Sequence, residues 1–190
     1  LSPLDREALN YCVDHYSHHE DWLELVAVYE AALRTRQRGS DESAMLIQIA
    51  LTLWKKVGDW ERAEGYFRRI KLSEPKNGLM LKFYEAYYNE RQDYRRLLTV
   101  LAAQQANEKS IEEKIHVGLK MAKVAEGELG SNEKAIDIYR GILKLDPDQP
   151  EARDALPSLF VATRKWNALL EHLKDELHRL PGDETARQVE

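Results

Sequence analysis

The chain has little glycine, proline or cysteine. Its 190 residues include nine glycines and six prolines, about 8% of the chain against roughly 12% in average proteins. This scarcity argues against a turn-rich β-sandwich or barrel and against disorder. The single cysteine, Cys12, excludes an intrachain disulfide framework and any zinc site built from several cysteines. No stretch of about 18 residues is free of charge, which excludes a bilayer-spanning segment.

Acidic residues outnumber basic ones and give a formal net charge of −5. Because a dedicated nucleic-acid binder usually carries a basic face, this balance speaks against that class. Charged residues make up 32% of the chain and hydrophobic residues 43%, a mixture typical of amphipathic helices. The first residues carry no basic-then-apolar signal. This favours a cytoplasmic location but leaves the compartment open.

The sequence repeats itself at an offset of 72 residues. Trp22 aligns with Tyr94 and Trp166, and Gly58 aligns with Gly130. The other matching columns are Leu25 with Leu97 and Leu169, Tyr29 with Leu101 and Leu173, Ala63 with Ala135, Phe67 with Tyr139, and Pro75 with Pro147. Each unit divides into steps of 34 and 38 residues, with four residues added around Ser40–Ser43 and again around Glu112–Ile115. Periods of this length indicate a repeat architecture.

Within each half of the unit, apolar residues recur at helical spacing. Leu46, Ile49, Ala50 and Leu53 lie on one face of a helix. After that helix, Gly58 suits a left-handed helix end. Next to it, Asp59 can cap the following helix, as Asp21, Asp93 and Ser131 can in their own turns. These signals predict ten helices in five antiparallel pairs, at 4–18 and 21–37, 42–57 and 60–73, 77–91 and 94–107, 110–128 and 132–145, and 150–163 and 166–179.

The pattern resembles the tetratricopeptide repeat, a helix–turn–helix unit of 34 residues. Residues 44–77 match best, and residues 116–149 match well in their second half. The residues that carry the match are Trp54, Gly58-Asp59-Trp60, Ala63, Phe67 and Pro75, with Gly130, Ala135, Tyr139 and Pro147 in the later copy. Half-a-TPR repeats are the nearest competing assignment, and the recurring Gly-Asp turn favours the first.

The resemblance implies an all-α fold, a right-handed α-α superhelix of about five antiparallel helix pairs. We expect a single array over 1–190, with repeats at about 6–39, 44–77, 78–111, 116–149 and 150–183. Residues 184–190 would begin a truncated or capping helix.

The chain departs from the family pattern at several positions. The family expects a small residue in the middle of each first helix, where the paired helices touch. Those positions here hold Ser17, Leu51, Glu85, Lys123 and Pro157. The small residue of the second helix is replaced by Leu25, Leu97 and Leu169 in three units. We therefore expect a divergent array, and a kink at Pro157 because proline removes a backbone hydrogen bond.

Nothing in the sequence indicates catalysis. His15, His18 and His19 form the only histidine cluster, which lacks the glutamate of a zinc protease motif. Solvated polar residues at a helix end are the simpler interpretation. Cys12 lies in step with apolar neighbours and is expected to be a buried structural thiol. No phosphate-binding loop or nucleophile elbow is present. We expect no enzyme activity, no cofactor and no metal.

In the family, the first helices of successive pairs line a concave face. This resemblance gives six hypothetical partner-binding residues: Gln48, Lys55, Lys56, Lys82, Asn89 and Lys120. Phe83 is a seventh, because the aromatic residues Phe83, Tyr84, Tyr87 and Tyr88 cover more of one helix than a core stripe needs. The four lysines would form a basic stripe for an acidic or C-terminal peptide, although ordinary solubilising lysines are an alternative. Phe83 is either an exposed anchor or a core residue. The two-carboxylate clamp of chaperone-binding members is absent, because Ala86 stands where that clamp has Asn.

These observations favour a non-enzymatic protein–protein interaction scaffold that binds a peptide or protein segment along the concave face. The alternatives are a structural spacer or assembly segment of a larger multidomain protein and, less favoured, an RNA-binding helical repeat. The expected partner is a protein or an acidic peptide rather than a nucleic acid or a membrane. A homodimer through uncapped array ends is a further option.

Overall fold

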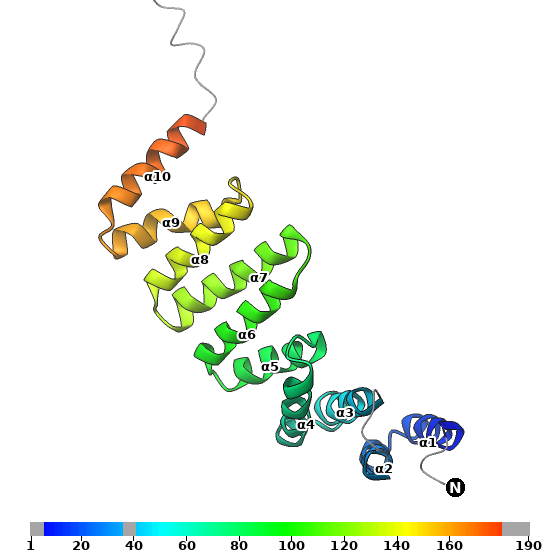
Figure 1. Ribbon diagram of the computed structural model, residues 1–190. Coiled ribbons are helices and arrows are strands. Elements are labelled where there is room, and N and C mark those ends of the chain that lie inside the picture. The colour runs from blue at the N-terminus through cyan, green and yellow to red at the C-terminus, as the bar shows by residue number, and fades with distance from the viewer. Residues whose placement is uncertain (1–5, 36–40, 180–190) are drawn as a thin grey trace, which may run out of the picture. The chain divides into compact units, whose positions relative to one another are not determined.

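All the regular structure in the described residues, 6–35 and 41–179, is helical (Figure 1). The structure is a computed structural model and confirms the all-α prediction for these ranges. The chain divides into two compact units, residues 1–92 and 93–190. The single array over 1–190 and its five repeats remain a prediction. The expected helix at 184–190 lies outside the described residues.

The regular elements of both units are helices. The helices of unit 1 are α1 (Arg6–His18), α2 (Trp22–Thr35), α3 (Asp41–Thr52) continued by the π-helical turn η1 (Leu53–Val57), α4 (Trp60–Ser73) and α5 (Gly78–Glu90). The helices of unit 2 are α6 (Tyr94–Asn107), α7 (Ile111–Lys123) continued by the π-helical turn η2 (Val124–Glu128), α8 (Asn132–Leu145), α9 (Pro150–Ala162) and α10 (Trp166–Arg179). Within the described residues, the predicted bounds differ from these by one residue at most, which is within the fraying of helix ends. The predicted helical residues 4–5 and 36–37 lie outside the described residues.

Five turns share one backbone feature, a left-handed residue just before the second helix of a pair. Gly58 and Gly130 have φ angles of 77° and 58° there, as expected of a glycine at a helix end. The other three turns hold Glu20, Gln92 and Arg164, with φ angles of 58°, 55° and 55°. Side chains with a Cβ are disfavoured in this region. The backbone therefore repeats at the 72-residue offset even where the glycine does not.

The two glycine turns follow first helices that are longer than the others and end in a π-helical turn. The Leu53 carbonyl accepts hydrogen bonds from the backbone N–H groups of Gly58 and Asp59. In unit 2 the N–H of Leu129 likewise donates to the Val124 carbonyl, at 3.1 Å. The segments 41–57 and 111–128 thus exceed the 13 residues of α1, α5 and α9. The four residues added to the repeat lengthen these helices.

The π-helical turns correct the predicted register of the small residues. A π turn holds one residue more than an α-helical turn. The small residue is predicted at a fixed number of residues before the turn glycine, so the extra residue puts the predicted position one residue after the true one. The small residues are Ala50 and Ala122, both with no exposed surface. Leu51 is half-buried and Lys123 is exposed. These two pairs therefore keep the small residue, one position before the one predicted from the repeat.

Side-chain caps fix the start of several helices. Asp59 accepts a hydrogen bond from the backbone N–H of Arg62 at 3.0 Å, and Asp93 caps α6 in the same way. The predicted cap at Ser131 is wrong, because its side chain makes no capping hydrogen bond. Both aspartates confirm the turn signals, since each satisfies an otherwise unpaired donor.

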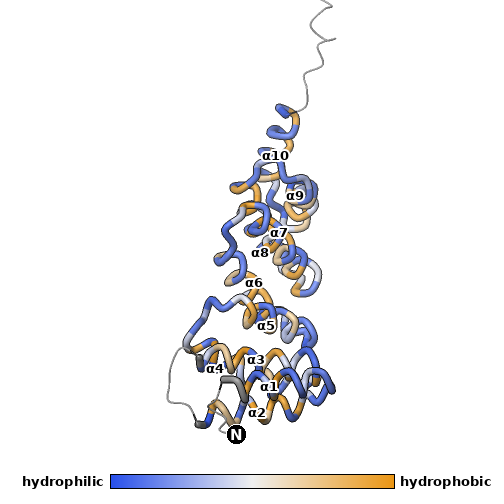
Figure 2. The backbone as a smooth tube through the Cα atoms, turned by 90° about the vertical axis from the view of Figure 1, so that its right-hand side faces the viewer, coloured by the Kyte–Doolittle hydropathy of each residue, from blue (hydrophilic) through white to orange (hydrophobic). Residues whose placement is uncertain are grey.

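Hydrophobic residues alternate with hydrophilic ones along the helices, and the former make the core of each unit (Figure 2). In unit 1, Ala63, Phe67 and Ile70 of α4 have no exposed surface, and the equivalent α8 residues are also buried. The fully buried aliphatic residues of α8 are Ala135, Ile136 and Ile142. Helix α9 runs without a break through Pro157.

Candidate protein-binding surfaces

Five of the seven predicted partner-binding residues lie exposed on unit 1. They are Gln48 on α3, Lys55 and Lys56 on η1, and Lys82 and Asn89 on α5. The Lys55 ammonium lies 3.4 Å from the centroid of the Trp54 ring, and that of Lys56 lies 4.7 Å from the centroid of the Trp22 ring. Such cation–π contacts hold the lysine side chains against the surface while their charges stay in solvent.

Lys120 lies exposed on α7, in unit 2. The other three lysines of the predicted stripe belong to unit 1. The continuous stripe from Lys55 to Lys120 therefore remains a prediction, and the basic surface that the structure supports is that of unit 1.

Phe83 is not an exposed anchor, because its side chain has no exposed surface. Its ring stacks on Phe67 at 4.3 Å between centroids and meets the Trp54 ring edge-on at 5.3 Å. A large ring in such a closely packed site contributes to the core through area burial and ring contacts. Of the two roles considered for Phe83, the structure supports packing.

The Phe83 ring belongs to a larger aromatic cluster whose rim reaches the surface. Trp54, Trp60 and Tyr87 are half-buried, and the Trp60 ring lies 6.4 Å from that of Tyr87. The Arg91 guanidinium lies 3.9 Å from the Tyr87 ring centroid and pairs with the Glu61 carboxylate. Trp, Tyr and Arg are the residue types that dominate binding energy in protein interfaces.

Two tyrosines of α4 and α5, Tyr66 and Tyr84, have raised pKa values. Burial, together with a 2.5 Å hydrogen bond donated to the Glu30 carboxylate, raises the pKa of Tyr66 to about 12. Burial and the negative charge of Glu64 raise the pKa of Tyr84 further above its ordinary value. Both hydroxyls therefore act as hydrogen-bond donors between helices and not as nucleophiles.

The histidines near the end of α1 form a local polar cluster. His19 Nδ1 lies 2.8 Å from the His15 carbonyl oxygen, and the two imidazole rings are 4.5 Å apart. Within residues 6–35 and 41–179, no three His, Cys, Asp or Glu side chains are grouped to hold a metal ion. Cys12 is only half-buried, in contrast to the fully buried thiol expected from its spacing.

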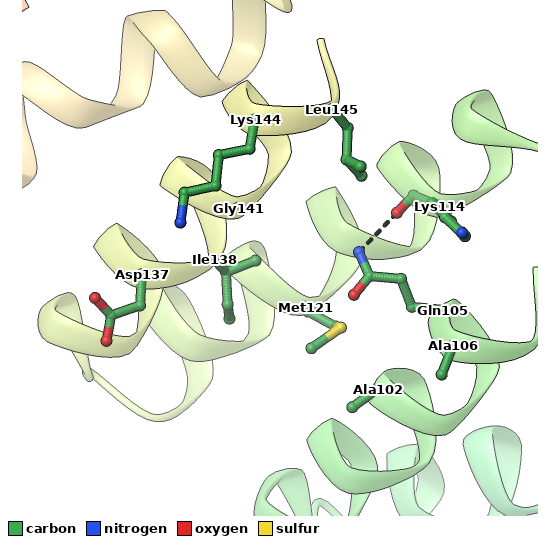
Figure 3. Close-up of a pocket in the computed structure, with 10 residues that line it drawn as sticks. All are labelled: Ala102, Gln105, Ala106, Lys114, Met121, Asp137, Ile138, Gly141, Lys144 and Leu145. Carbon is green, nitrogen blue, oxygen red and sulfur yellow. Dashed lines mark hydrogen bonds between the residues drawn. The ribbon is translucent and has the colours of Figure 1, made fainter. Parts of the chain in front are cut away.

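Unit 2 contains an open groove of about 510 Å³ between α6 and α8, with α7 at its floor (Figure 3). Small residues leave room for it: Ala102 and Ala106 on α6, and Gly141 on α8. The side chains of Met121 and Ile138 reach into the groove from α7 and α8. Gln105 donates a 2.8 Å hydrogen bond to the Lys114 carbonyl at one side. Its remaining lining residues are Asp137, Lys144 and Leu145.

The groove was not predicted from the sequence. The sequence feature that corresponds to the groove is a group of small residues, Ala102 and Ala106 on α6 and Gly141 on α8. Such residues are also ordinary helix formers, so they attract no notice until the helices are placed side by side.

Solved structures identify the fold. A tetratricopeptide repeat protein from Parabacteroides merdae superposes with a TM-score of 0.56 at 16% identity, over 93% of this chain and 67% of that one. This chain has a divergent tetratricopeptide-like fold. MamA residues 41 to the end, from Desulfovibrio magneticus RS-1, give a TM-score of 0.52 at 18% identity over 93% of this chain and 97% of that one. Another MamA structure gives 0.54 at 12% identity over 90% of each chain.

Comparisons of sequence alone find no relative. No family model matches the chain, and no curated protein matches it. At 12–18% identity, the solved structures show the fold alone. Function has to be argued from the surface residues of this chain. None of the described helices is long and apolar enough to cross a bilayer.

Proposed function

We propose that this protein is a non-enzymatic scaffold that binds an acidic peptide or protein segment along the first helices of its repeats. The observation that best supports this proposal is the contact between the Trp54 and Phe83 rings, whose centroids are 5.3 Å apart. This contact joins η1 to α5. Lys55 follows Trp54 in the sequence, and Lys82 precedes Phe83. Both lysines are exposed, so each ring of this contact has a cationic residue next to it in the sequence, and the Lys55 ammonium lies over the Trp54 ring.

The chemistry of this surface suits a carboxylate-rich segment. Lysine ammonium groups bind carboxylates through charge-assisted hydrogen bonds. The half-buried ring of Trp54 offers apolar area beside Lys55, and the half-buried rings of Trp60 and Tyr87 belong to the same aromatic cluster. A segment that combines acidic residues with one large apolar residue would match both features. Solvent and salt weaken the exposed ion pairs, so the aromatic contact should supply much of the affinity.

A displayed library of random peptides tests this proposal, because it offers acidic, basic and apolar sequences to the surface on equal terms. The full chain is used as bait, and selected peptides are resynthesised with a fluorescent label for anisotropy titrations. We expect enrichment in Asp and Glu next to an aromatic or aliphatic residue. The double variant Lys55→Glu/Lys82→Glu should weaken binding by about tenfold or more, since two charge-assisted contacts become repulsive.

The matched control is Lys109→Glu/Lys134→Glu, which changes the net charge equally at two exposed lysines of unit 2. It should change affinity by less than about twofold, because long-range effects between exposed charges are screened. Selection of peptides without acidic residues, or equal losses in both double variants, would refute the proposed surface.

A further inference from the structure

Helix α10 carries an exposed apolar stripe. Trp166, Leu170, Leu173 and Leu177 are 57%, 53%, 51% and 68% exposed. Their spacing of four, three and four residues places them on one face of the helix. Ala168 and Leu169, which lie off this stripe, pack against the core of unit 2. Contiguous exposed apolar surface of this kind usually marks an interaction site.

The internal repeat shows how such a stripe is used elsewhere in the chain. Two equivalents of Leu173, at offsets of 72 and 144 residues, are Leu101 on α6 and Tyr29 on α2. They are only 1% and 9% exposed. Val26, the α2 equivalent of Leu170, is 1% exposed. In unit 1, α2 packs against α3 and η1, and in unit 2, α6 packs against α7 and η2. Both equivalent stripes are thus on second helices that pack against a long first helix.

One position distinguishes the equivalent stripe of α2 from that of α6. The residue equivalent to Leu177 is Gln105 on α6 and Leu33 on α2. Gln105 forms a polar contact by donating to the Lys114 carbonyl of α7. A leucine cannot make this hydrogen bond and needs an apolar neighbour instead. The stripe of α10 is therefore more like that of α2, whose neighbour α3–η1 presents Met45, Leu46 and Ile49 as buried residues.

We infer that the exposed face of α10 is a docking surface for an amphipathic helix of the α3–η1 type. The occupant is a helix of about four turns whose apolar residues recur at helical spacing and include a small residue for close approach. A symmetric pair of α10 helices fits less well. Four half-exposed side chains offer on the order of 400 Å², whereas a stable dimer needs about 800 Å² per partner.

The test uses the full chain labelled with 5-fluorotryptophan and a synthetic peptide of residues 41–57, which is the α3–η1 segment itself. The ¹⁹F signal of Trp166 is assigned by its loss in Trp166→Phe. We expect the peptide to shift this signal and to saturate it, with a dissociation constant in the range of about 10 μM to 1 mM for so small a contact. The variant Leu170→Asp/Leu173→Asp should weaken binding by about tenfold or more, because it places two charges in an apolar contact.

The matched control is Leu72→Asp/Leu79→Asp, which changes two exposed leucines of α4 and α5. It should leave peptide affinity within about twofold of wild type. Circular dichroism of both variants checks that the helices persist. No Trp166 shift, or equal losses in the two variants, would overturn the inference.

Two other occupants give different results. A dimer that sediments as such in the wild type and dissociates in Leu170→Asp/Leu173→Asp would assign the face to a second copy. A Trp166 signal that a soluble paramagnetic agent cannot broaden in the monomer would show that the chain's own residues already cover the face. Either result would overturn docking of a separate α3–η1-type helix.

Discussion

Replacement of Gly118 by alanine tests how closely α7 is packed in unit 2. Gly118 is buried in the middle of α7. A Cβ atom at this position would lie 2.8 Å from Gln105 Nε2 and 2.9 Å from Ile142 Cγ1, closer than nonbonded atoms normally approach. Gln105 could rotate away only by giving up its hydrogen bond to the Lys114 carbonyl. Ile142 has no exposed surface and therefore little room to move.

Three contributions set the magnitude for Gly118→Ala. Overpacking in a closely packed core costs about 1–3 kcal/mol. Loss of the Gln105 hydrogen bond costs about 0.5–1.5 kcal/mol. Alanine recovers about 1 kcal/mol through its higher helix propensity. The net expectation is a destabilisation of about 0.5–3.5 kcal/mol, so the contacts outweigh the propensity.

Urea unfolding followed by circular dichroism measures the free energy of unfolding for wild type and variant. Amide hydrogen exchange in α7 and α8 reports whether the loss is confined to unit 2. Gly65→Ala on α4 is the control, because no atom lies within 4 Å of its added Cβ. It should stabilise the protein by about 0.5–1 kcal/mol. If Gly118→Ala stabilises the chain to the same degree, α7 is not closely packed at this position.

Further predictions concern the turns, the aromatic core and the tyrosine hydroxyl. Arg164→Gly should raise the free energy of unfolding by about 1 kcal/mol in urea melts by relieving a left-handed backbone, and Gly58→Ala should lower it by about the same amount. Phe83→Ala should cost about 3–5 kcal/mol by thermal or urea unfolding, with a smaller loss contradicting its core role. The folded state raises the Tyr66 pKa from 10.0 to about 12. The Tyr66 hydroxyl therefore makes its full contribution to the free energy of unfolding below pH 10, and this contribution is lost as the pH rises through 12. Stability measured from pH 9 to 12 should fall less in Tyr66→Phe than in wild type.

Helix positions could be predicted from the sequence because the ends are encoded locally. Asp59 and Asp93 satisfy backbone donors within their own helices, and Gly58 adopts the left-handed backbone that glycine permits. These features depend on a few neighbouring residues. They therefore appear in the sequence at the same places where they appear in the structure.

Features that depend on distant neighbours could not be predicted. The π-helical turns at η1 and η2 change the register by one residue without any characteristic residue type. The burial of Phe83 depends on Phe67 and Trp54, which come from two other elements. The groove beside Gly141 needs α6 and α8 to be placed next to each other. Each of these required tertiary packing to be known.

The alternation of long and short first helices has a consequence for changes in chain length. In the described units, the helix that follows and packs against α2 or α6 is a long first helix, whereas the helix that follows and packs against α4 or α8 is the short α5 or α9. Removing one 34-residue half would join helices whose surfaces were not shaped for each other. Adding or removing a whole 72-residue unit would keep every junction of the same kind. The natural module for lengthening or shortening this protein is therefore two helix pairs.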